Sequence, residues 1–299
     1  MTTLYLAKEP DQGVRADLSR ISDDLVVVDC LNAYGDYYRK KGYNCMSGED
    51  FLEGSDVKFD LIIGNPPYQG GSESKRWVLW HQFLEMSLRQ SDVVSLVIPS
   101  SITSPGKMWD MVKGNLKKID FTVGKYFKGV GSTFCRILVD KNYQGETEIV
   151  TDEGNLSLDV SGYDFLPPVV NEHNLSLYKY FTKGRTWKIS TEYHTSKKDK
   201  WLDKDGKIEV WHTNAQTLRT NTDHPNNKLI RVGVTLSGYP EFKVMNNMAG
   251  SQIIVYTVCD TLKEAQELAD QMNSSEIQEV MNVFKWSGWN KIEVIKLLG

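Results

Sequence analysis

The residues best suited to chemistry are four consecutive ones that follow an apolar run at 59–64, namely Asn65, Pro66, Pro67 and Tyr68. The two prolines restrict φ and keep the residues before them extended, so the backbone here is stiff. The amide oxygen of Asn65 and the carbonyl oxygen of Pro66 are hydrogen-bond acceptors. Two fixed acceptors can bind both hydrogens of one –NH2 group and direct its nitrogen lone pair toward an electrophile. The Tyr68 ring adds a flat face for stacking.

Two acidic residues also follow or precede apolar segments. Asp29 ends the apolar run that begins at Leu25, and Asp50 precedes Phe51 in the segment Gly48–Leu52. Each has a purely structural alternative. Asp29 could only cap the end of a strand, and Asp50 could be the N-cap of a helix, because an acid before an apolar pair suits that position.

The elements that must position these residues are visible as apolar runs rich in β-branched side chains. They lie at 4–7, 25–29, 59–64 and 93–98. Because these runs do not alternate with polar residues, they are typical of strands in a sheet covered on both faces. A helical spacing of apolar residues at 77, 80, 84 and 88 separates the last two runs. The alternation predicts an α/β fold with a doubly wound, mostly parallel sheet.

Two further runs predict a local antiparallel pair. Ile119–Val123 and Cys135–Val139 are separated by a connection that contains Gly129 and Gly131. We expect them to form two strands joined by a turn, at an antiparallel edge of the sheet. In open α/β sheets ligands bind beyond the carboxyl ends of the strands. The segment that starts at Asn65 occupies such an end.

The second half of the chain differs in charge. The whole chain of 299 residues has a formal net charge of −4. Residues 179–243 contain 13 Lys and Arg against 7 Asp and Glu, a local charge of +6 (13 − 7), which leaves −10 for the rest. If the chain binds nucleic acid, it must do so through this local basic region; the alternative is that the region is only a solvated face. A polar stretch at 141–175 precedes it and is expected to be a connecting segment, and we place a domain boundary between residues 145 and 146. A capping box at Thr261–Glu264 predicts that the chain ends in helices.

Composition and sequence pattern exclude a membrane protein, a disordered chain and a collagen-like fibre. Hydrophobic residues make up 40% and charged residues 25% of the chain, as in globular proteins. No apolar run approaches the ~18 residues of a membrane span, and the start of the sequence does not resemble a signal peptide, so we expect a cytoplasmic protein. The four cysteines form no C-x-x-C pair and the five histidines are scattered, so no metal site is predicted.

The segment Asn65–Tyr68 resembles the catalytic NPPY motif of amino-methyltransferases that use S-adenosylmethionine. It is most similar to the adenine-specific (N6) DNA methyltransferases of restriction–modification systems and phages. The resemblance covers most of the chain, strongly at 59–68 and loosely elsewhere. It implies a Rossmann-like methyltransferase catalytic domain at 1–145 and a C-terminal α+β target-recognition (DNA-binding) domain at 146–299. The implied reaction transfers a methyl group to the exocyclic amine of an adenine flipped out of double-stranded DNA.

The resemblance also implies roles for individual residues. Asn65, Pro66, Pro67 and Tyr68 would be catalytic, and Phe127 would lie against the target base. The cofactor would be bound by Asp29 at its ribose, by Asp50 and Phe51 around its adenine, and by Glu9, Pro10 and Gly13 around its methionine part. In the basic half, DNA contacts are expected from Lys197, Lys198, Arg219 and Arg231.

One departure from the family leaves alternatives open. The family has two or three glycines after its first strand, whereas this chain has one in the segment Glu9–Gly13. The cofactor pocket could be completed by a second protein chain. The chain could also be a weak or inactive methyltransferase-fold protein that binds DNA or regulates, or a methyltransferase acting on a protein glutamine or on RNA. The motif by itself does not separate adenine from cytosine, and the recognised DNA sequence does not follow from it.

Overall fold

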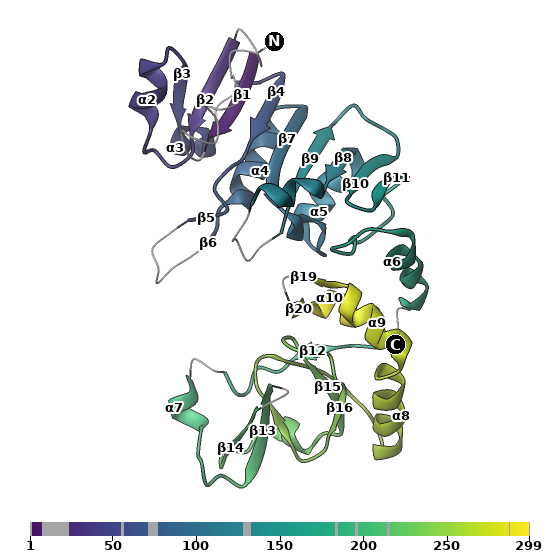
Figure 1. Cartoon of the computed structure of the whole chain (residues 1–299). Coiled ribbons are helices and arrows are strands. Elements are labelled where there is room, and N and C mark those ends of the chain that lie inside the picture. Colours follow the sequence, from purple (N-terminus) through teal and green to yellow (C-terminus); the bar gives the residue numbers. More distant parts are fainter. Residues whose placement is uncertain are drawn as a thin grey trace. The chain divides into compact units, whose positions relative to one another are not determined.

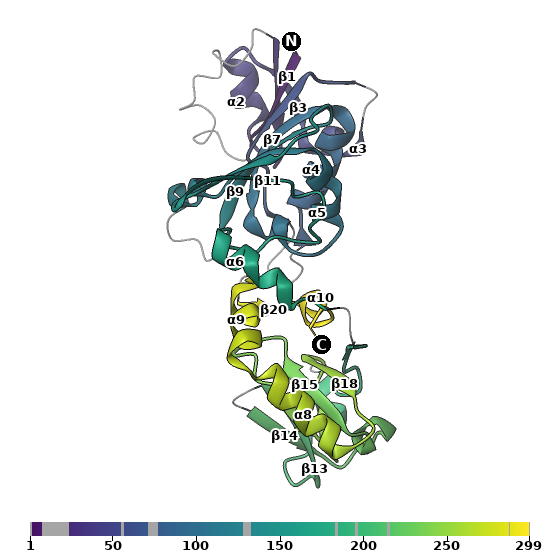
Figure 2. The ribbon, with the colours of Figure 1, turned by 90° about the vertical axis from the view of Figure 1, so that its right-hand side faces the viewer.

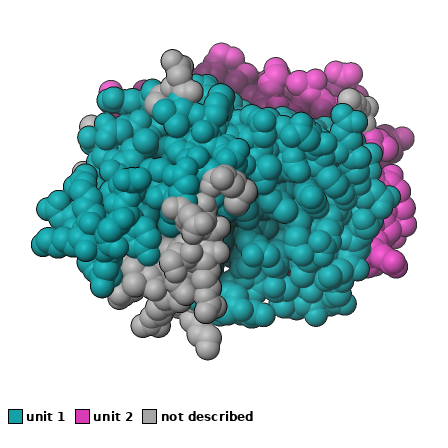
Figure 3. All heavy atoms as spheres, turned by 90° about the horizontal axis from the view of Figure 1, so that it is seen from above, with its two compact units in different colours: residues 1–165 teal, residues 166–299 magenta. Residues whose placement is uncertain are grey.

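The computed structural model describes residues 2–7, 24–54, 57–70, 77–127, 133–182, 185–194, 197–213, 216–286 and 288–298. The chain divides into two compact units, residues 1–165 and 166–299, which Figure 3 shows in different colours. Each unit has its own sheets and its own buried side chains.

Unit 1 is built on a sheet of nine strands in the order β11-β10-β8-β9-β7-β4-β1-β2-β3 (Figure 1). Its strands are β1 (Thr2–Ala7), β2 (Asp24–Asp29), β3 (Asn44–Ser47), β4 (Leu61–Gly64), β7 (Val93–Pro99), β8 (Leu116–Asp120), β9 (Phe134–Asp140), β10 (Thr147–Thr151) and β11 (Gly154–Leu158). β9 and β11 run antiparallel to their neighbours, and the other strands run parallel to one another. A short hairpin of β5 (Gln69–Gly70) and β6 (Trp77–Val78) follows β4.

The strand order reverses direction at β1. From β1 the chain builds outward through β2 and β3 on one side, and it then returns to the other side of β1 with β4 and β7. Such a reversal opens a crevice beyond the carboxyl ends of the strands, which is where open α/β sheets bind ligands.

Helices cover both faces of this sheet. They are α2 (Gly35–Lys40), α3 (Gly48–Glu53), α4 (Trp80–Gln90) and α5 (Lys107–Val112), with 3₁₀ turns η2 (Ser100–Thr103), η3 (Lys113–Asn115) and η4 (Thr122–Tyr126). Tyr38 of α2 packs in one cluster with Leu25 and Val27. Val28, which points to the opposite face, is also fully buried. The predicted α/β fold with a mostly parallel sheet is therefore confirmed.

The antiparallel pairing of β8 with β9 is also confirmed, but the prediction that this pair forms the edge of the sheet is wrong. β10 pairs in parallel with β8, through Glu148–Val150 against Lys118–Asp120, and β11 then pairs with β10. These strands belong to residues that were predicted to be a connecting segment. The boundary predicted after residue 145 consequently falls inside unit 1, which ends at residue 165.

Unit 2 has an α+β architecture with two main sheets, β12-β18-β15-β16 and β14-β13-β17. The strands are β12 (Lys188–Ile189), β13 (Ile208–Thr213), β14 (Gln216–Thr220), β15 (Arg231–Thr235), β16 (Lys243–Met245), β17 (Ala249–Gly250) and β18 (Ile254–Val258), followed by the pair β19 (Lys285–Trp286) and β20 (Trp289–Asn290). The helices are α6 (Glu172–Ser176), α7 (Lys198–Trp201), α8 (Leu262–Met272), α9 (Ser275–Val283) and α10 (Ile292–Ile295), with η5 (Leu177–Tyr180) and η7 (Pro225–Lys228).

Helix α8 packs against β15 and β16 (Figure 2). It begins as the capping box predicts, because the Thr261 hydroxyl accepts from the backbone N–H of Glu264 at 3.1 Å. The Glu264 carboxylate in turn accepts from the backbone N–H of Asp260 at 2.8 Å. None of the helices in the described residues combines the length and the apolar character that a membrane crossing requires.

Candidate functional site

The segment that begins at Asn65 leaves the sheet at the carboxyl end of β4, beside β1. Gly64, the last residue of β4, has φ of 148°, and a Cβ placed there would lie 2.4 Å from the carbonyl oxygen of Leu6. The backbone of β4 thus approaches β1 more closely than any side chain allows. The N–H of Asn65 donates to the same Leu6 oxygen at 3.1 Å. These two contacts fix the start of the segment at the reversal of strand order.

Within the segment, Pro66 and Pro67 are buried, and Asn65 and Tyr68 are half-buried. The Tyr68 hydroxyl donates a hydrogen bond to Oδ1 of Asn65. Burial raises the pKa of Tyr68, so the phenol remains protonated and able to donate at neutral pH. The bond orients the Asn65 amide, and an amide oxygen can accept from a second donor because it has two lone pairs.

An aromatic cluster surrounds Tyr68. The Tyr68 and Phe134 rings stack with centroids 4.6 Å apart, and the Phe127 ring lies 4.4 Å from Phe134 and 6.4 Å from Tyr68. Phe134 is buried, whereas Phe127 keeps some exposure. The structure therefore places Phe127 beside the Asn65–Tyr68 segment, although 59 residues separate Phe127 from Tyr68 (127 − 68) in the sequence.

Sequence reasoning missed Phe134. Its position at the start of β9 was the available signal, because β9 lies beside β7 and so near the same end of the sheet. The N–H of Ser100, after β7, donates to the carbonyl of Thr133 at 2.9 Å and holds this start in place. The buried Phe134 ring thus packs against the Tyr68 ring and restricts its movement.

Asp29, at the carboxyl end of β2, is only 2% exposed. Its Oδ2 accepts from the N–H of Tyr34 at 2.5 Å. Its Oδ1 is buried and has no hydrogen-bond partner among the described residues. A buried carboxylate oxygen without a donor is costly, so this atom is suited to accept hydrogen bonds from a ligand.

A cavity of about 240 Å³ adjoins this carboxylate. Its lining residues are Asp29, Asn32, Ala33, Gly35, Asp36, Arg39, Cys45, Met46 and Ser47. The turn after β2 is held against α3, because Asn32 Oδ1 accepts from the N–H of Gly48 at 2.7 Å. A Cβ on Gly48 would lie 2.7 Å from the Cys30 carbonyl oxygen, so only glycine permits this approach.

Asp50 and Phe51 do not line this cavity. Ser47, not Asp50, is the N-cap of α3: its hydroxyl accepts from the N–H of Asp50 at 3.0 Å and donates to the Asp50 carboxylate at 2.5 Å. Phe51 is fully buried, and its ring stacks on Phe83 of α4 at 5.8 Å. The expected cofactor contact of Phe51 is therefore wrong, because the ring forms part of the core between α3 and α4. Glu9, Pro10 and Gly13 lie outside the described residues.

The residues expected to contact DNA differ in exposure. Lys197 is exposed, and Lys198 begins α7. Arg219 is exposed on β14 and pairs with Glu209 at 3.1 Å. Arg231 is fully buried, donates to the Met248 carbonyl, and lies 4.9 Å from the centre of the Tyr256 ring. The expectation that Arg231 contacts DNA is thus wrong, because its guanidinium is enclosed within unit 2.

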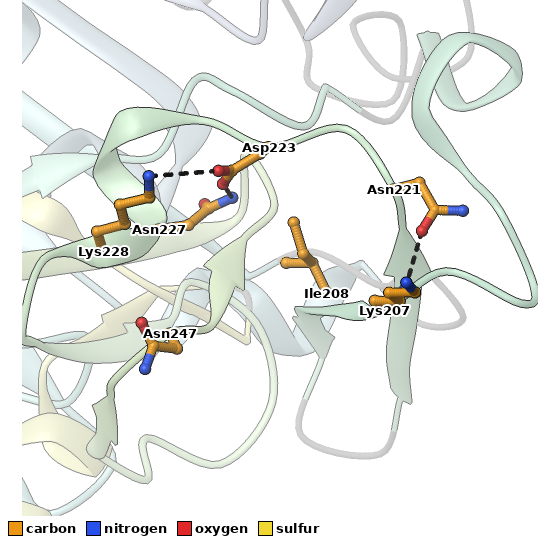
Figure 4. A pocket seen from close by; sticks show the side chains of 7 residues that line it. All are labelled: Lys207, Ile208, Asn221, Asp223, Asn227, Lys228 and Asn247. Atoms are coloured by element: carbon orange, nitrogen blue, oxygen red, sulfur yellow. Dashed lines mark hydrogen bonds and ion pairs between the residues drawn. The ribbon is translucent and has the colours of Figure 1, made fainter.

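Unit 2 contains a second pocket, of about 320 Å³, lined by Lys207, Ile208, Asn221, Asp223, Asn227, Lys228 and Asn247 (Figure 4). Its polar groups largely satisfy one another. Asn221 accepts from the N–H of Lys207 at 3.2 Å, and Asn227 donates to Asp223 at 3.3 Å. Asp223 also pairs with Lys228 at 3.7 Å. We therefore place the chemical site in unit 1.

No family model and no curated protein matches the chain. Distant similarity exists to solved structures. The type I restriction-modification methyltransferase subunit from Streptococcus thermophilus is 14% identical with a TM-score of 0.37, over 54% of this chain and 46% of that one. The type IIL restriction-modification enzyme MmeI, solved in complex with DNA, is 10% identical with a TM-score of 0.49, over 89% of this chain and 47% of that one. The 23S rRNA methyltransferase ErmE is 15% identical with a TM-score of 0.33, over 48% of this chain and 63% of that one. The chain matches less than two thirds of the length of each.

Proposed function

We propose that this chain is an S-adenosylmethionine-dependent DNA methyltransferase that methylates the N6 amine of adenine. The observation that supports this proposal most is the place of Asn65–Tyr68. The segment follows the carboxyl end of β4 beside the reversal of strand order, where open α/β sheets bind ligands. Its sequence resembles the catalytic motif of these enzymes, and Asn in the first position with Tyr in the fourth favours adenine through that resemblance.

The Asn65 amide oxygen and the Pro66 carbonyl oxygen would hold the two hydrogens of the target amine. They are acceptors, so they stabilise the positive charge that develops on the amine nitrogen as it reacts. Their rigid attachment to β4 means that little reorganisation is needed at that moment. The amine lies inside the duplex, so the base must first be flipped out, which costs a few kcal/mol. Stacking of the flipped base on Tyr68 and Phe127 offsets this cost by ~1–3 kcal/mol for each aromatic face.

The cavity beside Asp29 suits the cofactor. Bound there, S-adenosylmethionine would supply an electrophilic sulfonium methyl group. The Asp29 Oδ1 atom, which is buried without a donor among the described residues, would accept from the ribose hydroxyls. Both the cavity and Asn65 lie at carboxyl ends of parallel strands that flank β1. In this proposal unit 2 is the target-recognition domain, with Lys197 and Arg219 contacting phosphates.

The direct test is transfer of labelled methyl groups from S-adenosylmethionine to unmodified duplex DNA, followed by identification of the modified base. Label on adenine N6 supports the proposal and opens the way to mapping the recognised sequence. Label that appears only on RNA or on a protein glutamine contradicts the DNA substrate but keeps the amine chemistry. The absence of both methyl transfer and cofactor binding contradicts the enzyme itself. It favours a DNA-binding or regulatory protein, or a site that needs a second chain.

Replacing Asp29 with asparagine is expected to weaken cofactor binding. The change preserves shape and can still accept from the Tyr34 N–H, but it replaces one carboxylate oxygen with a donor. Loss of a hydrogen bond to a charged group corresponds to about a tenfold or larger increase in the cofactor Kd. Titration calorimetry with S-adenosylmethionine measures this Kd for the variant and the wild-type protein.

The matched control is Asp36→Asn on the rim of the same cavity. The Asp36 side chain is 89% exposed and pairs with Arg39, so the Kd should barely change. Equal affinities for the Asp29 and Asp36 variants would show that Asp29 does not hold the cofactor.

A further inference from the structure

Tyr126 has the largest exposed fraction, 75%, among the exposed large hydrophobic side chains of the described residues. It is the last residue of η4 and directly precedes Phe127. Phe127 belongs to the aromatic cluster around Tyr68, so Tyr126 lies on the rim of the site. A tyrosine ring in water forgoes the burial free energy of its apolar surface, so a partner that covers this ring would recover that free energy.

The backbone beneath Tyr126 is well fixed. The Asp120 carboxylate, at the end of β8, accepts from the N–H of Thr122 at 2.9 Å and from its hydroxyl at 2.7 Å. The N–H of Phe121 donates to the carbonyl of Val150 in β10 at 2.9 Å. At the other end of η4, the N–H of Phe127 donates to the Gly124 carbonyl at 3.0 Å. The sheet therefore holds Tyr126 outward in a defined place.

A cation accompanies the ring. The Lys125 ammonium lies 5.4 Å from the centre of the Tyr126 ring, and both residues are exposed. A flat aromatic surface next to a flexible positive charge matches a nucleic acid, in which stacked bases alternate with phosphates. A nonpolar protein partner would have no equivalent use for the lysine.

We infer that Tyr126 enters the DNA duplex at the position that the target base vacates, and that Lys125 contacts a neighbouring phosphate. This inference rests on the proposed function. Flipping a base removes its stacking and leaves a gap, which an inserted side chain can fill. Tyr126 directly precedes Phe127, which would lie against the flipped base, and its ring is exposed at the rim of the site, where the duplex can reach it. Tyr126 is then a positioning residue that favours the flipped state and touches no reacting atom.

The test compares Tyr126→Ala with the wild-type protein on two duplexes that contain the mapped target adenine. In one duplex the adenine is paired with thymine. In the other it faces an abasic site, so no base pair and less stacking keep the adenine inside the helix. We expect Tyr126→Ala to lower the single-turnover methylation rate about tenfold or more on the paired duplex, as loss of a stacking contact predicts. On the abasic duplex the rate should stay within about twofold of wild type, because flipping no longer limits it.

Tyr126→Phe is the matched control, since it keeps the ring and should keep the wild-type rate. Because the side chain is exposed, the alanine variant should fold, which a thermal melt checks. Equal wild-type and Tyr126→Ala rates on the paired duplex overturn the inference alone. An equal loss on both duplexes also overturns it, since the ring would then act in general binding. If the wild-type protein transfers no methyl group to DNA, the proposed function fails, and the inference fails with it.

Discussion

Replacing Asn65 with alanine is expected to lower methyl transfer at least about 100-fold, the effect of removing one preorganised hydrogen-bonding group from an active site. The substitution deletes the amide oxygen that would accept from the target amine. It also removes the amide oxygen to which the Tyr68 hydroxyl donates. It keeps the backbone N–H that bonds to Leu6, so the segment should stay at the end of β4. The loss should therefore appear in kcat and not in folding.

The measurement is single-turnover transfer of labelled methyl to DNA, with cofactor binding and DNA binding measured on the same samples. We expect both affinities to remain close to wild type, because Asn65 is not among the residues of the cofactor cavity or of unit 2. Asn142→Ala, at an exposed position after β9, is the matched control and should be fully active. Near-wild-type turnover by the Asn65 variant would refute the assignment of the site.

Gly64→Ala should destabilise unit 1 by about 2–6 kcal/mol, the sum of backbone strain and overpacking. At φ of 148° an L side chain is strained, and its Cβ would lie 2.4 Å from the oxygen and 2.7 Å from the nitrogen of Leu6. The clash is with backbone, so no side chain can rotate away. Relief would require β1 and β4 to separate at the point where Asn65 begins. A loss of this size is a large fraction of the ~5–15 kcal/mol that stabilises a domain.

Thermal unfolding followed by circular dichroism measures this effect, and Gly114→Ala is its control. Gly114 lies in η3, has no atoms within 4 Å of an added Cβ, and shows no positive φ. Its substitution should change the free energy of unfolding by less than about 1 kcal/mol, in the stabilising direction if at all. If the two variants melt at the same temperature, the close approach of β4 to β1 is not present in solution.

Much of unit 1 could be predicted from the sequence, because buried parallel strands must be apolar on both faces. The runs at 25–29, 59–64 and 93–98 therefore appear in the structure as β2, β4 and β7. Strands β10 and β11 escaped prediction, since β11 forms the edge of the sheet and both strands alternate exposed polar residues with more buried ones. The unit consequently extends to residue 165 and not to 145.

For the candidate site, the sequence by itself determined the local chemistry. Two adjacent prolines make a stiff backbone in any fold, and an Asn and a Tyr beside them supply an acceptor and a ring. Only the tertiary structure decided which distant residues join them. It placed Phe127 and Phe134 beside Tyr68, sent the Phe51 ring into the core against Phe83, and buried Arg231 against Tyr256. The reason is physical: φ restriction and hydrogen-bonding capacity belong to a residue and its neighbours, whereas exposure depends on which elements pack over it, and that is settled by long-range pairing of strands.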